Sequence, residues 1–218
     1  MINIAIDGPS GAGKSTVARA VAAKLDILYL DTGAMYRACG LYAVRKGKDP
    51  ADYKDAVGLL SEINVDVEYE GGRQITLLNG EDVSDAVRAH EISKAASDIS
   101  KHPEVRMKLV EMQRKIASKT SVVLDGRDIG TYVLPECRNK FYLTASPEIR
   151  AQRRYKELSA KGAECDYATI LADIIQRDYN DSHRDFAPLR QAADAVFIDS
   201  GEMTPEEVRD FILARLKY

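Results

Sequence analysis

A glycine-rich segment near the N-terminus has the residue types and spacing that bind phosphate groups. Residues 8–15 read Gly-Pro-Ser-Gly-Ala-Gly-Lys-Ser, which fits the pattern G-x-x-x-x-G-K-[ST]. Glycines let the backbone curl so that its N–H groups point at phosphate oxygens, and a helix that follows adds the positive end of its dipole. Lys14 would reach the β- and γ-phosphates, and the Ser15 hydroxyl would take a place on Mg²⁺. The alternative is a glycine-rich turn without a ligand. We predict that ATP contacts Gly8, Pro9, Ser10, Gly11, Ala12, Gly13, Lys14, Ser15 and Thr16.

A carboxylate follows a buried-looking run much later in the chain. Asp125 comes directly after Val122-Val123-Leu124. If that run and the N-terminal run form neighbouring strands, Asp125 lies near the glycine-rich loop, where it would hold the metal directly or through water. The alternative is an ordinary turn or capping aspartate.

Three arginines in the C-terminal half share one helical face. Arg150, Arg153 and Arg154 stand at positions i, i+3 and i+4, with Glu157 as the one nearby acidic residue on that face. Their mutual repulsion indicates a demand for an anion, which a triphosphate would meet. Arg153 would otherwise form a plain surface ion pair with Glu157, and such pairs contribute little to stability.

Further cations fall where a second anionic substrate would need them. Arg37 begins a helix after the second expected strand, and Arg127 follows the third. Arg177, Asp181 and Arg184 stand at i, i+4 and i+7 of another helix. A kinase must hold two anions together and neutralise the phosphoryl group in flight, whereas a binding switch needs few cations beyond the loop. The pattern favours phosphoryl transfer, although an Arg177–Asp181 surface pair would explain part of it.

The elements that must position these residues alternate between strand and helix. Short apolar runs predict five strands, at Ile2–Ile6, Ile27–Leu30, Val122–Leu124, Phe141–Ala145 and Ala195–Ile198. Helical patterns lie between them, which predicts an α/β fold whose parallel sheet is covered by helices on both faces. Ligands of such sheets bind beyond the carboxyl ends of the strands, where Asp7, Asp31 and residues 125–128 stand.

The long segment between the second and third expected strands has a different sequence pattern. Apolar and polar residues alternate over 64–84, interrupted by Gly71-Gly72 and Asn79-Gly80, which are hairpin turn signals. We predict a small antiparallel insertion preceded by two helices. Two more would follow, at about Asp85–Ser100 and at Pro103–Ala117, because proline disfavours helix in the residue before it.

Composition narrows the class of protein. The 218 residues are 45% hydrophobic and 30% charged with a net charge of −3, as expected of a soluble globular domain. No basic surface for nucleic acid, signal peptide or membrane-spanning run is visible. Three scattered cysteines provide no disulfide framework and no metal-ligand spacing, so we expect a reduced, cytoplasmic setting.

With these residues in view, the sequence resembles bacterial cytidylate kinases, a branch of the nucleoside monophosphate kinases, essentially from end to end. The most specific segments are Asp7–Ser15, Asp31–Arg37, Asp125–Thr131 and Arg177–Leu189. The resemblance implies a three-layer P-loop fold whose five parallel strands have the order 2-3-1-4-5. It implies one domain over 1–218, with an acceptor region at 32–118 and a lid at about 154–170.

The resemblance also implies an activity. It is ATP-dependent phosphorylation of CMP and dCMP with Mg²⁺. We separately expect a monomer, and the composition indicates that it binds neither membrane nor nucleic acid. By position, the acceptor phosphate and the transferred group would be held by Thr32, Arg37, Arg127 and Arg177. Asp181 and Arg184 would lie near the acceptor ribose and phosphate, and Ser97, Arg106 and Asp128 would face the base. Lys14, Arg127, Asp128 and Arg177 are the expected catalytic set, Ser15 and Asp125 the metal set, and Arg153 and Arg154 complete the ATP site.

Base recognition by these three residues makes physical sense. Cytosine offers an amino donor, which suits the Asp128 carboxylate, whereas uracil presents a carbonyl oxygen there. Without the resemblance, Ser97 and Arg106 would be an ordinary helical serine and a surface arginine.

Three rival functions stay open. A guanine-nucleotide switch would need Asn-Lys-x-Asp, but Asn139-Lys140 is followed by Phe141-Tyr142. A kinase of the same fold would act on another acceptor, such as UMP, AMP or shikimate. A scaffold would keep the loop without activity.

Overall fold

The computed structural model describes residues 1–218, with the side chain of His90 excepted. The chain forms two compact units. The first comprises Met1 and Ile27–Val122, and the second comprises Ile2–Asp26 and Val123–Tyr218. Apart from Met1, the first unit is therefore one continuous segment, inserted between the two parts of the second unit.

The main sheet has five strands in the order β2-β6-β1-β7-β8. Neighbouring strands run parallel, with Ile6 of β1 opposite Phe141 of β7 and Phe141 opposite Val196 of β8. The strands are β1 Asn3–Asp7, β2 Leu28–Asp31, β6 Val122–Gly126, β7 Asn139–Thr144 and β8 Val196–Asp199. All five predicted strands and their predicted order are confirmed.

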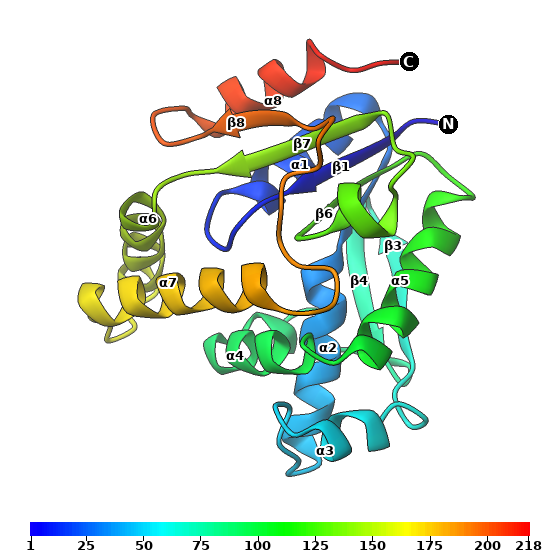
Figure 1. Cartoon of the computed structure of the whole chain (residues 1–218), viewed down its shortest axis with the longest axis vertical. Helices are drawn as coiled ribbons and strands as arrows, with labels where there is room; N and C mark the ends of the chain where they lie inside the picture. Colours follow the sequence, from blue (N-terminus) through cyan, green and yellow to red (C-terminus); the bar gives the residue numbers. More distant parts are fainter. The chain divides into compact units, whose positions relative to one another are not determined.

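In the second unit, helices pack in pairs around the strands (Figure 1). Helix α1 spans Lys14–Leu25 and packs with α8, Pro205–Leu213. Helix α6, Pro147–Ala160, packs with α7, Tyr167–His183, through buried apolar side chains on both helices. Ser146 caps α6 and Asp166 caps α7, since each side chain accepts a bond from an N–H in the first turn. All five residues of β6 are buried, so the residues at its end are held firmly.

The first unit contains the predicted antiparallel insertion. Its strands are β3 Val65–Glu70, β4 Arg73–Leu78 and β5 Glu81–Asp82. Gly71 and Gly72 have φ of 57° and 76°, and Asn79 and Gly80 have φ of 51° and 84°. Positive φ at both central residues is the condition for a tight two-residue hairpin, so the turn signals in the sequence were correct.

The first unit also contains helices. They are α2 Thr32–Arg45, α3 Tyr53–Gly58, α4 His90–Ile99 and α5 Pro103–Ala117. Of these, α2 packs against β3 and β4. Gly40 of α2 lies against α4, where an added Cβ would stand 2.9 Å from the backbone of Ala95 and Ala96. Helix α5 begins and ends as predicted.

The predicted helix at about 85–100 is wrong in its first part. The structure has a short 3₁₀ turn at Ala86–Arg88, an extended Ala89 (φ −58°, ψ 143°), and only then α4. Val87 and Ile92 are both buried, yet on one straight helix they would point about 140° apart. The break at Ala89 lets both face the core. Among the described residues, no helix combines the length and apolar character that crossing a bilayer requires.

Candidate active site

The phosphate loop joins β1 to α1 with three glycines at positive φ. These are Gly8 (150°), Gly11 (77°) and Gly13 (87°). A Cβ on Gly8 would lie 1.9 Å from the Leu143 carbonyl oxygen, so only glycine fits there. Helix α1 has no side-chain cap and no acidic residue in its first turn. Its first N–H groups are therefore left to a ligand, as the motif predicts.

Lys14 is a buried cation at the start of α1. Its Nζ donates to the Pro9 carbonyl over 2.7 Å. Burial and, to a lesser degree, the charge of Arg127 lower the Lys14 pKa to about 7, against the opposing effect of Asp125 and Asp181. An anion beside Nζ would restore the charged form.

Ser15 and Asp125 meet as predicted. The Ser15 Oγ donates to Asp125 Oδ2 over 2.9 Å, because β6 lies beside β1 in the sheet. Among the described side chains, no group of three or more His, Cys, Asp or Glu could hold a metal. Mg²⁺ in phosphoryl-transfer sites is commonly bound by one or two protein oxygens plus phosphates and water, so a hydroxyl next to a carboxylate suits it.

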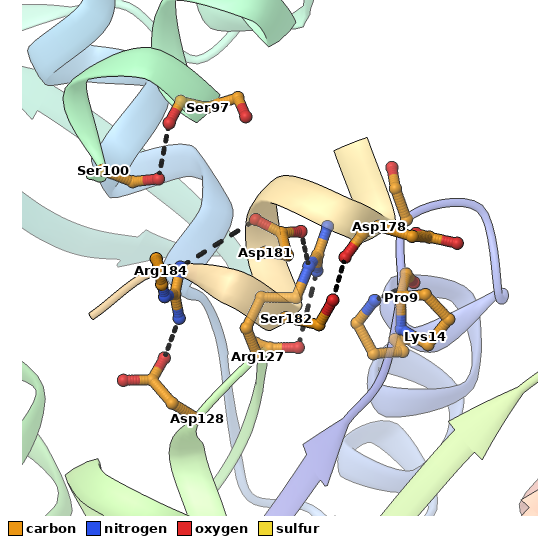
Figure 2. Close-up of polar contacts among 12 residues, drawn as sticks. Pro9, Lys14, Ser97, Ser100, Arg127, Asp128, Asp178, Asp181, Ser182 and Arg184 are labelled. Carbon is orange, nitrogen blue, oxygen red and sulfur yellow. Dashed lines mark hydrogen bonds and ion pairs between the residues drawn. The ribbon is translucent and has the colours of Figure 1, made fainter. Parts of the chain in front are cut away.

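A network of ion pairs follows β6 and the end of α7. Arg127 Nε donates to Asp181 Oδ2 over 2.7 Å, and Arg184 stands between Asp181 and Asp128 (Figure 2). Arg184 Nη2 lies 3.5 Å from Asp128 Oδ1, and Nη1 lies 3.9 Å from Asp181 Oδ1. Burial would raise the pKa of Asp181, but the charges of Arg127 and Arg177 outweigh burial and hold that pKa below its ordinary value. Asp181 is therefore an ionised bridge between guanidinium groups.

The end of α7 differs from the sequence prediction. The helix stops at His183, so Arg184 lies just beyond it and not on the face of Arg177 and Asp181. The chain turns back there, with Ala187 at φ 48° and Leu189 N–H donating to the Asp181 carbonyl over 2.7 Å. Arg184 Nε also donates to the Ala187 carbonyl over 2.8 Å. The turn after α7, and not helical spacing, places this guanidinium.

Arg150 contradicts the expected unmet demand for an anion on α6. Its guanidinium donates to the carbonyls of Ala145 (2.8 Å) and Ser10 (3.0 Å) and pairs with Asp178 of α7 (2.6 Å). The reasoning failed because all three partners lie outside the helical neighbours that spacing reveals. Through its bond to the Ser10 carbonyl, Arg150 stabilises the backbone of the phosphate loop.

The other two arginines of α6 have separate partners. Arg153 Nη2 donates to the Ser200 carbonyl over 2.6 Å. Arg154, and not Arg153, pairs with Glu157, at 2.9 Å. Contact of Arg153 and Arg154 with ATP stays a prediction.

In the first unit, α2 begins at Thr32, so Arg37 lies in its second turn and does not begin the helix as expected. Asp31 caps α2 through Ala34 N–H, and its other oxygen accepts from Arg37 Nη2 over 2.9 Å. Thr32, the first residue of α2, is buried. Gln74 of the insertion accepts from Asp31 N–H over 2.7 Å, a contact that no local sequence signal announces.

Ser97 and Arg106 lie on neighbouring helices of the same unit. Arg106 of α5 is 1% exposed, with its guanidinium carbon 5.2 Å from the centre of the Tyr36 ring. Arg106 Nη1 donates to the Ser100 carbonyl, and Ser100 Oγ donates to the Ser97 carbonyl. Arg106 is therefore no surface arginine. Burying a charge is costly unless it is paired or hydrogen-bonded, and the Ser100 carbonyl and the Tyr36 ring offset part of that cost for Arg106.

Sequence reasoning also missed the role of Asp7. Its carboxylate accepts from Ile129 N–H (2.8 Å) and Gly130 N–H (2.7 Å). The position after a strand marked Asp7 as interesting, but nothing local indicated its partners.

A phosphate loop after the first strand of a 2-3-1-4-5 parallel sheet defines the P-loop kinase fold. A kinase of that fold needs cations that neutralise the transferred phosphoryl group, and arginines can supply them. The model of the cytidylate kinase family matches residues 4–218. A cytidylate kinase of Caldicellulosiruptor bescii is 49% identical over 97% of this chain and 94% of its own length. One of Clostridium acetobutylicum is 50% identical over 97% and 96%. Among solved structures, shikimate kinase from Bacteroides thetaiotaomicron is 16% identical and covers 98% of this chain and 95% of its own, with a TM-score of 0.47. The chain belongs to the cytidylate kinase family.

Proposed function

We propose that this chain transfers the γ-phosphoryl group of ATP to CMP and dCMP, giving ADP and the corresponding diphosphate. The observation that carries the proposal is the buried Arg127–Asp181–Arg184–Asp128 network in the same compact unit as the phosphate loop. A protein that only binds ATP has no need of such a network. The family match favours cytidine nucleotides as the acceptor.

The donor side follows from the loop. Backbone N–H groups of residues 8–15 and the Lys14 ammonium would bind the phosphates, and Arg153 and Arg154 would contribute to the ATP site. Ser15 and Asp125 would hold Mg²⁺, which when bound neutralises charge on the β- and γ-phosphates. Their hydroxyl and carboxylate oxygens are hard donors, and they already lie 2.9 Å apart.

The transfer step needs little covalent chemistry from the protein. The acceptor phosphate oxygen is already ionised near neutral pH, so no strong general base is required. Lys14, Arg127 and Arg177 would stabilise the charge of the transferred group during in-line displacement. Asp181 would keep Arg127 oriented for this task, because it accepts directly from Arg127 Nε.

The acceptor side follows from the family match. Thr32 and Arg37 would bind the acceptor phosphate, and Asp181 and Arg184 the ribose and phosphate. Ser97, Arg106 and Asp128 would read the base, with the Asp128 carboxylate accepting from the cytosine amino group. The burial of Arg106 against Tyr36 supports a fixed, functional guanidinium.

Coupled ADP release across a panel of acceptors tests the proposal. The purified protein with Mg²⁺ and ATP is assayed with CMP, dCMP, UMP, AMP and shikimate, and without acceptor. We expect turnover with CMP and dCMP, weaker turnover with UMP, and background ADP without acceptor. ADP release independent of acceptor would indicate a hydrolysing switch, and a higher kcat/KM for AMP or shikimate would assign another acceptor. Lys14→Met is the matched inactive control.

We also expect a monomer in a reduced, cytoplasmic setting. All three cysteines are free in the structure. Sedimentation at micromolar concentration would test the monomer.

A further inference from the structure

Asp7 anchors the turn that directly follows Asp128, a residue of the proposed acceptor site. Asp7 ends β1, directly before the phosphate loop, and is 5% exposed. Its two carboxylate oxygens accept from consecutive backbone N–H groups, those of Ile129 and Gly130. These residues begin the π-helical turn Ile129–Val133. The first N–H groups of a helical turn have no partner within it, so Asp7 supplies both missing acceptors.

Asp7 has little freedom to move. Its backbone pairs with Tyr142 of β7, and the next residue, Gly8, lies so close to β7 that a Cβ would stand 1.9 Å from the Leu143 carbonyl oxygen. On the far side, a Cβ on Gly130 would lie 3.3 Å from Asp7 Oδ2 and 3.1 Å from the Lys140 side chain. Any displacement of this carboxylate must therefore move the turn.

The turn fixes Asp128, the residue before it. The Asp128 carbonyl accepts from Tyr132 and Val133 N–H groups over 2.9 and 3.0 Å, so its backbone belongs to the turn. Its carboxylate lies 3.5 Å from Arg184 Nη2. Asp128 is thus held through its backbone by the turn that Asp7 anchors, and through its side chain by Arg184.

We propose that Asp7 is a positioning residue for base selection: through the Ile129 and Gly130 amides it holds Asp128 where its carboxylate accepts from cytosine and repels uracil. The inference rests on the proposed function, in which Asp128 reads the base. Asp7 would then be linked to two functional segments. The phosphate loop follows it in sequence, and the turn after β6 donates to its carboxylate.

The test is the ratio of kcat/KM for CMP to kcat/KM for UMP at saturating Mg²⁺ and ATP. Asp7→Asn replaces one acceptor oxygen by an amide that faces a backbone N–H, so the turn must shift. A good polar pair discriminates between bases by roughly 5- to 150-fold, so we expect the ratio to fall by ~5-fold or more. Any effect of the variant on ATP binding cancels in the ratio.

Asn139→Ala is the matched control. Asn139 is also buried in the second unit and bonds to backbone, accepting from Lys217 N–H (2.7 Å) and donating to the carbonyls of Lys217 (3.1 Å) and Asn3 (3.5 Å). It should lower the thermal midpoint and leave the ratio unchanged, which separates positioning from loss of stability.

If Asp7→Asn does not fold, Gly130→Ala tests the positioning role of Asp7. It keeps the Asp7 carboxylate but crowds it and the Lys140 side chain, and we expect the same fall in the ratio. A wild-type ratio in the folded variants, or an equal fall in Asn139→Ala, overturns the inference. Failure of the proposed function would look different, as a wild-type protein that does not phosphorylate CMP.

Discussion

Arg150 of α6 and Asp178 of α7 form an ion pair at 2.6 Å, while the same guanidinium donates to the Ser10 carbonyl of the phosphate loop. One side chain thus links the loop to the helix that carries Arg177 and Asp181. A shift of α7 and a shift of the loop are therefore coupled by a direct contact.

Arg150→Met should destabilise the protein. The free energy of unfolding should fall by roughly 2–3 kcal/mol, less than the 3–5 kcal/mol typical of a fully buried pair, because the Asp178 side chain is 25% exposed. Urea unfolding measures it. Arg209→Met, which breaks an exposed pair with Asp210, should barely change the midpoint, and an equally small change for Arg150→Met would refute the linkage.

Arg177→Ala should lower kcat by about 10³-fold, the scale of arginines that stabilise phosphoryl transfer. Single-turnover kinetics isolates the chemical step. Gln176→Ala, at the exposed neighbouring position of α7, should keep wild-type kcat. Equal chemical rates in wild type and Arg177→Ala would remove Arg177 from the mechanism.

Asp128→Asn should weaken the preference for CMP. The amide can donate to the uracil oxygen, so the CMP to UMP ratio of kcat/KM should fall by roughly 5- to 150-fold. The exposed Asp185→Asn serves as the control. A wild-type ratio in Asp128→Asn would assign base reading to other residues.

Removal of the metal should abolish transfer. EDTA should stop ADP release, and Asp125→Asn should raise the Mg²⁺ concentration for half-maximal activity by ~10-fold or more, because it weakens the oxygen pair that Asp125 forms with Ser15. Activity is titrated against free Mg²⁺. An unchanged requirement in this variant would place the metal elsewhere.

Asp7 should make stability depend on pH. Burial raises its pKa to about 7, so between about pH 4 and 7 the folded state binds a proton that the unfolded state has lost. Its contribution to stability is therefore greatest in acid and is lost as pH rises through 7. The free energy of unfolding of wild type relative to Asp7→Asn should be higher at pH 5 than at pH 8. An equal difference at both pH values would contradict the raised pKa.

Local patterns predicted most of the fold, because strands and hairpin turns have short-range causes. The apolar run at 122–124 and the loop after β1 also placed Asp125 correctly near Ser15, since parallel strands end at one edge. The order of the strands came from the family resemblance. The break at Ala89 was not predicted, because it depends on the burial of both Val87 and Ile92 in the core. No residue type near Ala89 indicates that burial.

The candidate site was predicted unevenly for the same reason. The phosphate loop could be predicted because its residue types and spacing within residues 8–15 are enough to indicate phosphate binding. The hydrogen-bond partners of Arg150 and Asp7 lie up to 140 and 123 residues away in the sequence. The spacing of residues along one helix or strand therefore cannot predict these bonds.

The first unit is one unbroken segment, and its two ends meet, since Leu28 N–H donates to the Ser121 carbonyl over 3.3 Å. A stretch of chain that starts and finishes at one spot can be exchanged through two adjacent splices without rerouting the rest. A foreign segment grafted between these positions would therefore leave both the phosphate loop and the Arg127–Asp181–Arg184–Asp128 network in the chain, because all of them belong to the second unit.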